Sequence, residues 1–75
     1  MAKPDPVLKS FGQAVKRHRE AKDLTQERLA EKADLDRTYL SDIERGTRNA
    51  GVKNLVRIAR ALGISASDLM EGVGA

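Results

Sequence analysis

Apolar side chains recur at intervals of three and four residues along most of the chain, which is the spacing of amphipathic α-helices. No segment has the sustained two-residue alternation of a half-buried strand, and β-branched and aromatic content is low. Four shorter apolar stripes follow a longer first one. That first stripe consists of Val7, Leu8, Phe11 and Val15, with His18 at its edge. The pattern predicts an all-α fold of five helices.

Capping residues and glycines indicate where each helix begins and ends. Asp5-Pro6 is a favourable start for the first helix, because aspartate caps free N–H groups and proline needs no hydrogen-bond partner in the first turn. The later helices are expected at about 26–33, 37–45 and 52–62, with a short one after Ser65. The predicted N-caps are Thr25, Asp36 and Ser65, and the predicted stops are Gly46 and Gly63. The tail, Gly72 to Ala75, is expected to fray.

The second and third predicted helices, within residues 25–46, meet the requirements of a helix-turn-helix. Ala30 is a small residue where the two helices would cross, and Asp34 tolerates the left-handed backbone of a tight turn. Leu40 and Ile43 would turn one face of the third helix inward. When such a helix lies in the major groove of DNA, side chains near its N-terminus meet base edges. The free face carries Arg37, Thr38, Ser41, Asp42 and Arg45, with Tyr39 near its edge.

The side chains on this face can bind DNA. Their polarity alone does not distinguish a DNA-recognition helix from an ordinary solvated helix. Arginine can bind guanine O6 and N7 together, and a threonine methyl group can contact the thymine methyl group. The alternative is a small helical bundle whose third helix presents a solvated polar face. The combination of short helices, a small crossing residue, a turn and an N-cap favours DNA binding.

Length and composition narrow the function further. The chain has 75 residues, which predicts one domain over residues 1–75 and leaves no room for a small-molecule effector domain. It has no cysteine, which excludes disulfides, thiolate zinc sites and cysteine nucleophiles and is compatible with a reducing cytoplasm. No apolar run approaches the roughly 20 residues of a membrane span, and the N-terminus lacks the apolar core of a signal peptide. A cytoplasmic protein without membrane contacts is expected.

The net charge of +3 is unevenly distributed. Residues 9–60 hold thirteen lysines and arginines against eight acidic residues, whereas residues 61–75 hold two acidic residues and no lysine or arginine. A basic body suits a polyanionic partner, because each neutralised phosphate releases counterions. A surplus of this size can also serve solubility alone.

The sequence offers no catalytic, metal or cofactor site. His18 is the sole histidine and lies beside the apolar stripe, and the serines have no plausible base nearby. Residues 34–45 briefly resemble a calcium loop, but Tyr39 and Arg45 replace the glycine and glutamate that it requires. Residues 46–51 have the spacing of a phosphate-binding loop, but Val52 replaces its essential lysine. An enzyme is therefore not expected.

Several short segments, in order and at the right spacing, resemble the phage lambda repressor and Cro class of helix-turn-helix regulators. They are Thr25-Gln26, Leu29-Ala30, residues 43–46 (IERG) and residues 58–64 (IARALGI). Residues 35–39 (LDRTY) followed by IERGTRN are similar, within that class, to the controller proteins of restriction–modification systems. The resemblance covers about residues 11–70. It implies a five-helix, lambda-repressor-like domain, and the similarity to controller proteins implies a regulator that binds tandem operators and times expression of the endonuclease.

The resemblance also implies roles for individual residues. Gln26 matches a position that touches a backbone phosphate and braces the first residue of the third helix. Residues 37–39 match positions that meet bases and neighbouring phosphates, and residues 45–49 match the helix end and loop that hold the phosphate backbone. Glu44 is expected to form an ion pair inside the protein. The full implied DNA-binding set is Gln26, Arg37, Thr38, Tyr39, Ser41, Asp42, Arg45, Arg48 and Asn49.

Two positions depart from the family pattern, and a third, Asp42, has an unusual charge for its place. Asp34 stands where glycine is usual, which should strain the turn slightly, and Ala50 stands where proline is common, which should loosen the loop before the fourth helix. Asp42 places a negative charge on the face that would enter the groove. It would either accept a hydrogen bond from a cytosine amino group or repel wrong sequences.

The resemblance further implies a homodimer, with two recognition helices about one turn of DNA apart and a roughly palindromic operator in double-stranded DNA. Family precedent places the dimer contact on the last two helices. The apolar candidates there are Val52, Ile64, Leu69, Met70 and Val73. The alternative function is an antitoxin or protein-interaction module that binds a protein partner tightly and DNA only secondarily.

Overall fold

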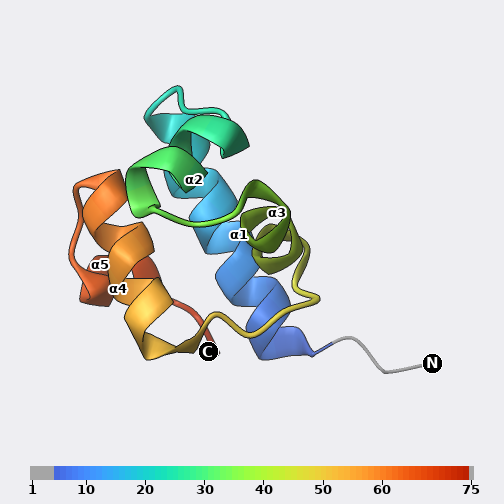
Figure 1. Ribbon diagram of the computed structural model, residues 1–75. Helices are drawn as coiled ribbons and strands as arrows, with labels where there is room; N and C mark the ends of the chain where they lie inside the picture. The colour runs from blue at the N-terminus through green and yellow to red at the C-terminus, as the bar shows by residue number, and fades with distance from the viewer. Residues whose placement is uncertain (1–4, 75) are drawn as a thin grey trace.

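The computed structural model describes residues 5–74 as five helices, with no strand in that range. The helices are α1 (Pro6–Ala21), α2 (Gln26–Ala33), α3 (Arg37–Arg45), α4 (Gly51–Leu62) and α5 (Ala66–Met70). α3 lies on one side of α1, and α4 and α5 lie on the other (Figure 1). The predicted all-α, five-helix fold is confirmed. Within the described residues, no helix has the length and apolar character needed to cross a membrane.

Side-chain caps begin four of the helices where the sequence predicted them. Asp5 Oδ1 accepts a hydrogen bond from the Val7 N–H at 2.9 Å, and Thr25 Oγ1 accepts one from the Arg28 N–H at 3.1 Å. The caps at Asp36 and Ser65 form in the same way, with bonds of 2.8 and 2.9 Å. Each cap satisfies an N–H group that the first helical turn leaves without a partner.

The fourth helix begins differently from the prediction. It starts at Gly51, one residue before the predicted Val52, and the residue at its cap position, Ala50, has no side chain that can accept a hydrogen bond. Instead, Asn49 Oδ1 accepts a hydrogen bond from the Gly51 N–H at 3.2 Å. The loop residue therefore stabilises the start of α4 in place of an N-cap.

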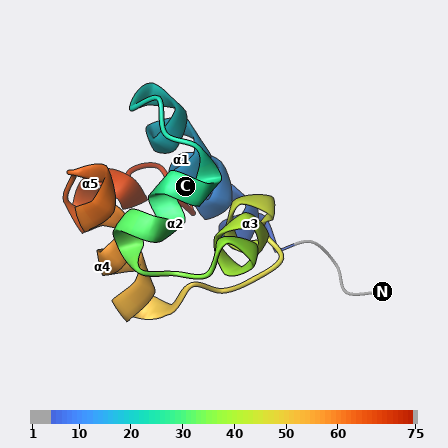
Figure 2. The ribbon, with the colours of Figure 1, turned by 45° about the horizontal axis from the view of Figure 1, so that its top comes forward.

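The core lies where the helices meet. The fully buried large side chains are Val15, Leu29, Leu40, Ile43, Ile58, Leu62 and Leu69. α1 packs against α3 and α5, and α2 packs against α3 and α4, so that α2 and α3 share one apolar interior with the rest of the molecule (Figure 2). Burial of these side chains is the main force that fixes α3 relative to the other helices.

The C-terminal segment after α5 continues as turns. Residues 71–74 form turns, and the Val73 N–H donates to the Met70 carbonyl oxygen at 2.9 Å. The Val73 side chain is half-buried against the core. That residues 72–75 fray stays a prediction for residues 72–74, where Val73 has apolar contacts, and Ala75 lies outside the described residues.

Candidate nucleic-acid interface

The turn between α2 and α3 depends on a residue in the left-handed conformation. Asp34 has φ 57° and ψ 46°, and the Leu35 N–H donates to the Ala30 carbonyl oxygen at 2.8 Å. A residue other than glycine in this conformation costs about 1 kcal/mol. Leu35 packs against the core and helps to hold the turn. Asp34 thus adopts the backbone that the family usually assigns to glycine.

Two glycines allow α3 to lie unusually close to α1. A Cβ atom on Gly12 would be 2.3 Å from the Ile43 carbonyl oxygen and 2.6 Å from that of Glu44. Gly46, at φ 78°, ends α3 and lies so close to α1 that a Cβ atom would be 2.7 Å from Lys9 Cα. Gly12 had no predicted role, although an isolated glycine inside a helical pattern is a signal of close packing.

A buried ion pair joins α1 to the end of α3. Arg19 Nε lies 2.8 Å from Glu44 Oε2, and Arg19 Nη2 donates to Glu44 Oε1 at 3.1 Å. Only 11% of the Arg19 side chain and 3% of the Glu44 side chain are exposed. The hydrogen bond to Glu44 raises the pKa of the Arg19 guanidinium above its ordinary value. The predicted internal ion pair of Glu44 is present, with a partner that the sequence did not identify.

Gln26 also reaches this ion pair. Its side-chain Nε2 donates to Glu44 Oε1 at 3.0 Å, and Arg19 Nη1 donates to the Leu24 carbonyl oxygen at 2.7 Å. The sequence prediction that Gln26 braces the first residue of α3 is therefore corrected. The Gln26 side chain donates its hydrogen bond to Glu44, which is the last residue but one of α3. The start of α2, the end of α3 and α1 share one hydrogen-bonded network.

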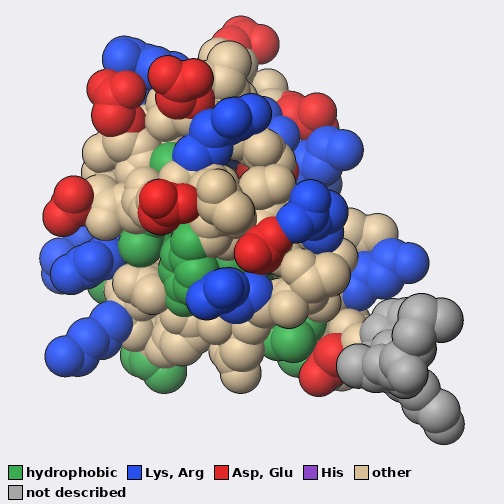
Figure 3. All heavy atoms as spheres, turned by 45° about the vertical axis from the view of Figure 1, so that its right-hand side comes forward, with side chains coloured by type: hydrophobic (Ala, Val, Ile, Leu, Met, Phe, Trp, Pro, Cys, Tyr) green, Lys and Arg blue, Asp and Glu red, His purple; other side chains and the backbone are tan. Residues whose placement is uncertain are grey.

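The outward face of α3 remains open. Arg37, Thr38 and Arg45 are exposed and Ser41 is half-buried. These four side chains line one shallow hollow. Lys and Arg side chains alternate with Asp and Glu around a small hydrophobic patch on the face shown in Figure 3, so that face is not uniformly basic. A polyanion that binds this face would therefore contact individual cations and not a continuous basic surface.

Tyr39 connects α3 to the loop that follows. Its hydroxyl group donates to the Ala50 carbonyl oxygen at 2.9 Å and accepts from Asn54 Nδ2 at 2.8 Å. The guanidinium carbon of Arg48 lies 5.1 Å from the centre of the Tyr39 ring, within range of a cation–π interaction. The role of Asn54 was not predicted from the sequence, since a hydrogen bond between side chains 15 residues apart depends on the fold.

Asp42 contacts two arginines of the implied DNA-binding set. Arg45 Nη2 donates to Asp42 Oδ1, and Arg48 Nε lies 3.8 Å from Asp42 Oδ2. The Thr47 N–H and hydroxyl group both donate to the Asp42 carbonyl oxygen, at 3.0 and 3.1 Å. The end of α3 and the next loop are thus linked through one residue.

The sequence matches the helix-turn-helix family over residues 15–69. The chain belongs to the helix-turn-helix family. Control protein C.BamHI of Bacillus amyloliquefaciens is 50% identical over 62 residues, which cover 81% of this chain and 76% of that protein. Control protein C.MunI of a Mycoplasma species is 47% identical over 64 residues, covering 84% and 86%. The predicted resemblance to controller proteins is confirmed.

Solved structures of controller proteins share this helix-turn-helix fold. C.AhdI from Aeromonas hydrophila is 44% identical with a TM-score of 0.81, over 83% of this chain and 94% of that one. C.Esp1396I, solved as a tetramer in complex with its natural 35 base-pair operator, is 39% identical with a TM-score of 0.84, over 92% and 91%. The lambda-repressor-like architecture implied by the sequence therefore extends over most of the chain.

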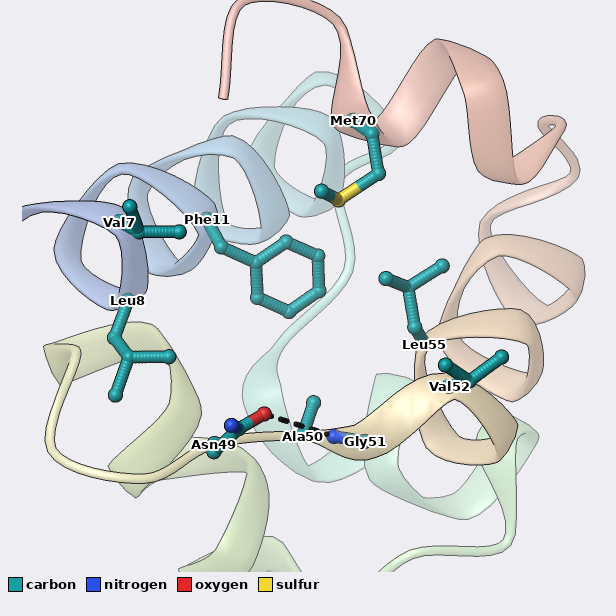
Figure 4. A pocket seen from close by; sticks show the side chains of 9 residues that line it. All are labelled: Val7, Leu8, Phe11, Asn49, Ala50, Gly51, Val52, Leu55 and Met70. Atoms are coloured by element: carbon teal, nitrogen blue, oxygen red, sulfur yellow. Dashed lines mark hydrogen bonds between the residues drawn. The ribbon is translucent and has the colours of Figure 1, made fainter. Parts of the chain in front are cut away.

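The residues predicted to form the dimer contact do not all lie on one surface of the structure. Val52 is 78% exposed, and with Met70 it lines an apolar hollow that Val7 and Leu55 also border (Figure 4). The hollow is lined by Val7, Leu8, Phe11, Asn49, Ala50, Gly51, Val52, Leu55 and Met70. Val7, expected in the core stripe, is itself 50% exposed. The hollow is open to solvent at Val52 and Val7.

Two of the other predicted dimer residues, Leu69 and Ile64, lie elsewhere, and Val73 packs against the core beside Met70. Leu69 is fully buried in the core, so its assignment to the dimer surface is wrong: its position on α5 points it into the apolar interior. Ile64 borders a different hollow, together with Arg17 and His18. His18 is half-buried at the edge of the core, as the sequence predicted. Within residues 5–74, no group of three or more acidic or His side chains is placed to hold a metal ion.

Proposed function

We propose that this chain is a sequence-specific transcriptional regulator that binds a palindromic operator as a homodimer, in the manner of a restriction–modification controller. The observation that supports this best is α3 itself. Its outward side chains are exposed and polar, whereas its inner face is fixed by Leu40, Ile43 and the Arg19–Glu44 ion pair. A recognition helix must be held rigidly to place donors within hydrogen-bond range of base edges.

The proposed DNA contacts divide by position. Arg37, Thr38 and Ser41 would face base edges, and Arg45, Arg48 and Asn49 would meet phosphates from the end of α3 and the following loop. Gln26 would reach a phosphate only with donors that Glu44 leaves free. Phosphate contacts set the register, and base contacts provide the specificity.

For the homodimer we propose the apolar surface around Val52, Met70 and Val7. Exposed apolar side chains grouped at one hollow mark an association surface more often than scattered ones do. Association would bury Val52, which is otherwise 78% exposed. Val52→Asp should shift the protein toward monomers in sedimentation equilibrium, whereas Ile64→Asp should do so only if the contact extends to the second hollow. A monomeric wild type would refute the dimer.

The function is tested by selecting bound sequences from a random DNA library and sequencing them. Enrichment of a palindrome would support a dimeric regulator and give its operator. Failure to enrich any sequence at moderate salt would refute sequence-specific readout. Tight one-to-one capture of a protein partner by the same sample would then favour the antitoxin alternative.

Arg37→Ala tests the assignment of base readout to α3. Arg37 is the first residue of α3 and is exposed. Its loss should weaken operator binding by about 1–3 kcal/mol and relax base preference at one position. The measurement is a titration of the operator and of single-base variants by fluorescence anisotropy. An equal loss on random DNA would instead make Arg37 a phosphate contact.

Arg48→Ala tests the phosphate contacts. It should weaken binding to operator and random DNA alike and reduce the slope of log affinity against log salt by about one. Arg60→Ala is a matched control, because Arg60 is exposed on α4 and borders a hollow with Lys22 and Gly63, away from α3. A salt slope that stays unchanged in Arg48→Ala would contradict the proposed role.

A further inference from the structure

Asp42 lies on the outward side of α3, yet it is the most covered charged group there. Only 21% of its side chain is exposed, against 64% for Arg45 and 54% for Arg48. The two guanidinium groups cover the carboxylate from two sides, one at each oxygen. Oδ1 accepts from Arg45, and Oδ2 faces Arg48 Nε at 3.8 Å.

This arrangement leaves most guanidinium donors directed away from the carboxylate. An arginine side chain has five N–H donors in a planar fork. Arg45 uses one nitrogen, Nη2, toward Asp42, and Arg48 presents Nε to it. More than half of each arginine side chain is exposed, so donors remain for phosphate oxygens.

Arg48 is held from a second direction. Its guanidinium lies over the Tyr39 ring, and both hydrogen bonds of the Tyr39 hydroxyl group, to Ala50 and Asn54, fix that ring. Thr47 binds the Asp42 backbone, which closes the loop around the same residue. The four side chains of Tyr39, Asp42, Arg45 and Arg48 form one cluster, which we call the Asp42 cluster.

We propose that Asp42 is a positioning residue, which holds Arg45 and Arg48 in place for phosphate contacts and reads no base itself. The inference rests on the proposed DNA-binding function. A carboxylate that read cytosine would have to present an oxygen to the amino group in the major groove. Oδ1 of Asp42 instead accepts from Arg45, and Oδ2 faces the Arg48 guanidinium, with its Nε at 3.8 Å. The cluster carries a net charge of +1 and presents its cations outward.

The proposal predicts the effect of Asp42→Asn on operator binding. Holding a flexible side chain in its bound position before association removes an entropic cost. Loss of the carboxylate frees two arginines, so operator affinity should fall by about three- to tenfold, even though the protein becomes more basic. The measurement is a titration of the operator selected above, with Glu31→Gln as control. Glu31 pairs with Arg28 three residues away, which matches the Asp42–Arg45 spacing on another helix.

The decisive comparison repeats Asp42→Asn in a background that already carries Arg45→Ala and Arg48→Ala. A positioning residue has nothing left to position there, and the uncovered carboxylate only repels phosphates. Asp42→Asn should therefore leave operator affinity unchanged or raise it in that background. A base-reading Asp42 would lose affinity in both backgrounds, and its loss would change the preferred base at one position.

Tighter operator binding by Asp42→Asn in the otherwise native protein would show that Asp42 withholds the arginines from DNA, and would overturn the proposal. If the selection enriches no sequence and the native protein binds all duplexes equally, sequence-specific function fails. The sign of the Asp42→Asn effect on that shared affinity then still decides whether Asp42 positions the arginines. Thermal melting of each variant excludes unfolding as the cause.

A measurement on the protein without DNA tests the same positioning role of Asp42. In the free protein, ¹⁵N relaxation of the arginine Nε–H groups should show Arg48 as the more ordered side chain relative to Arg57, which is exposed on α4. Asp42→Asn should reduce that difference, with the Tyr39 ring as the remaining contact of Arg48. Equal order of Arg48 and Arg57 in the native protein would contradict the proposal.

Discussion

Replacing Glu44 with alanine should lower the free energy of unfolding by about 3–5 kcal/mol, the range seen when one member of a buried ion pair is removed. Arg19 would be left with a charge that is largely shielded from water, and Gln26 would lose its hydrogen-bond acceptor. A domain of this size has roughly 4–11 kcal/mol in total. Chemical denaturation followed by circular dichroism measures the change directly.

The ion pair can be separated from simple burial by a second variant. Arg19→Met combined with Glu44→Leu replaces both charges by apolar groups, which is often neutral or stabilising when the volumes match. The double variant should therefore be more stable than Glu44→Ala alone. If it is as unstable as the sum of the single changes, the two side chains do not interact and the interpretation of the network is wrong.

Gly12→Ala should destabilise the protein by about 3 kcal/mol, at the upper end of the usual cost of overpacking. The added Cβ would be 2.3 Å from the Ile43 carbonyl oxygen, which is backbone and cannot rotate away. Alanine is otherwise the better helix residue by about 0.5–1 kcal/mol, so the sign of the effect reports the packing. The clash between the added Cβ and the Ile43 carbonyl oxygen can be relieved only if α3 moves away from α1.

The control is Gln13→Ala, one position further along α1 at an exposed site. It should leave stability within about 0.5 kcal/mol of the native protein. Denaturation midpoints distinguish the two variants, and operator titration of any folded Gly12→Ala protein should show weaker binding, because α3 is displaced. A Gly12→Ala protein as stable as Gln13→Ala would mean that α1 and α3 are not in close contact.

The sequence alone determined the helices and most of their ends. A cap involves groups only two or three residues apart, so Asp5, Thr25, Asp36 and Ser65 could be recognised without knowing the tertiary structure. The periodic apolar positions were sufficient to predict which face of α3 turns inward. The ordered motifs from residue 25 to residue 64 were sufficient to identify the family.

The tertiary structure decided which distant groups meet. Glu44 was expected to pair with some cation, but only the crossing of α1 and α3 selects Arg19, 25 residues away. The same crossing requires Gly12 to be glycine, and the packing of α5 directs Leu69 inward instead of toward a dimer contact. Asp42 was assigned to the DNA-binding set because its place on α3 is outward. Its pairing with Arg45 is local, three residues along the same helix, but its pairing with Arg48 follows from the path of the loop after Gly46, which short-range periodicity does not encode.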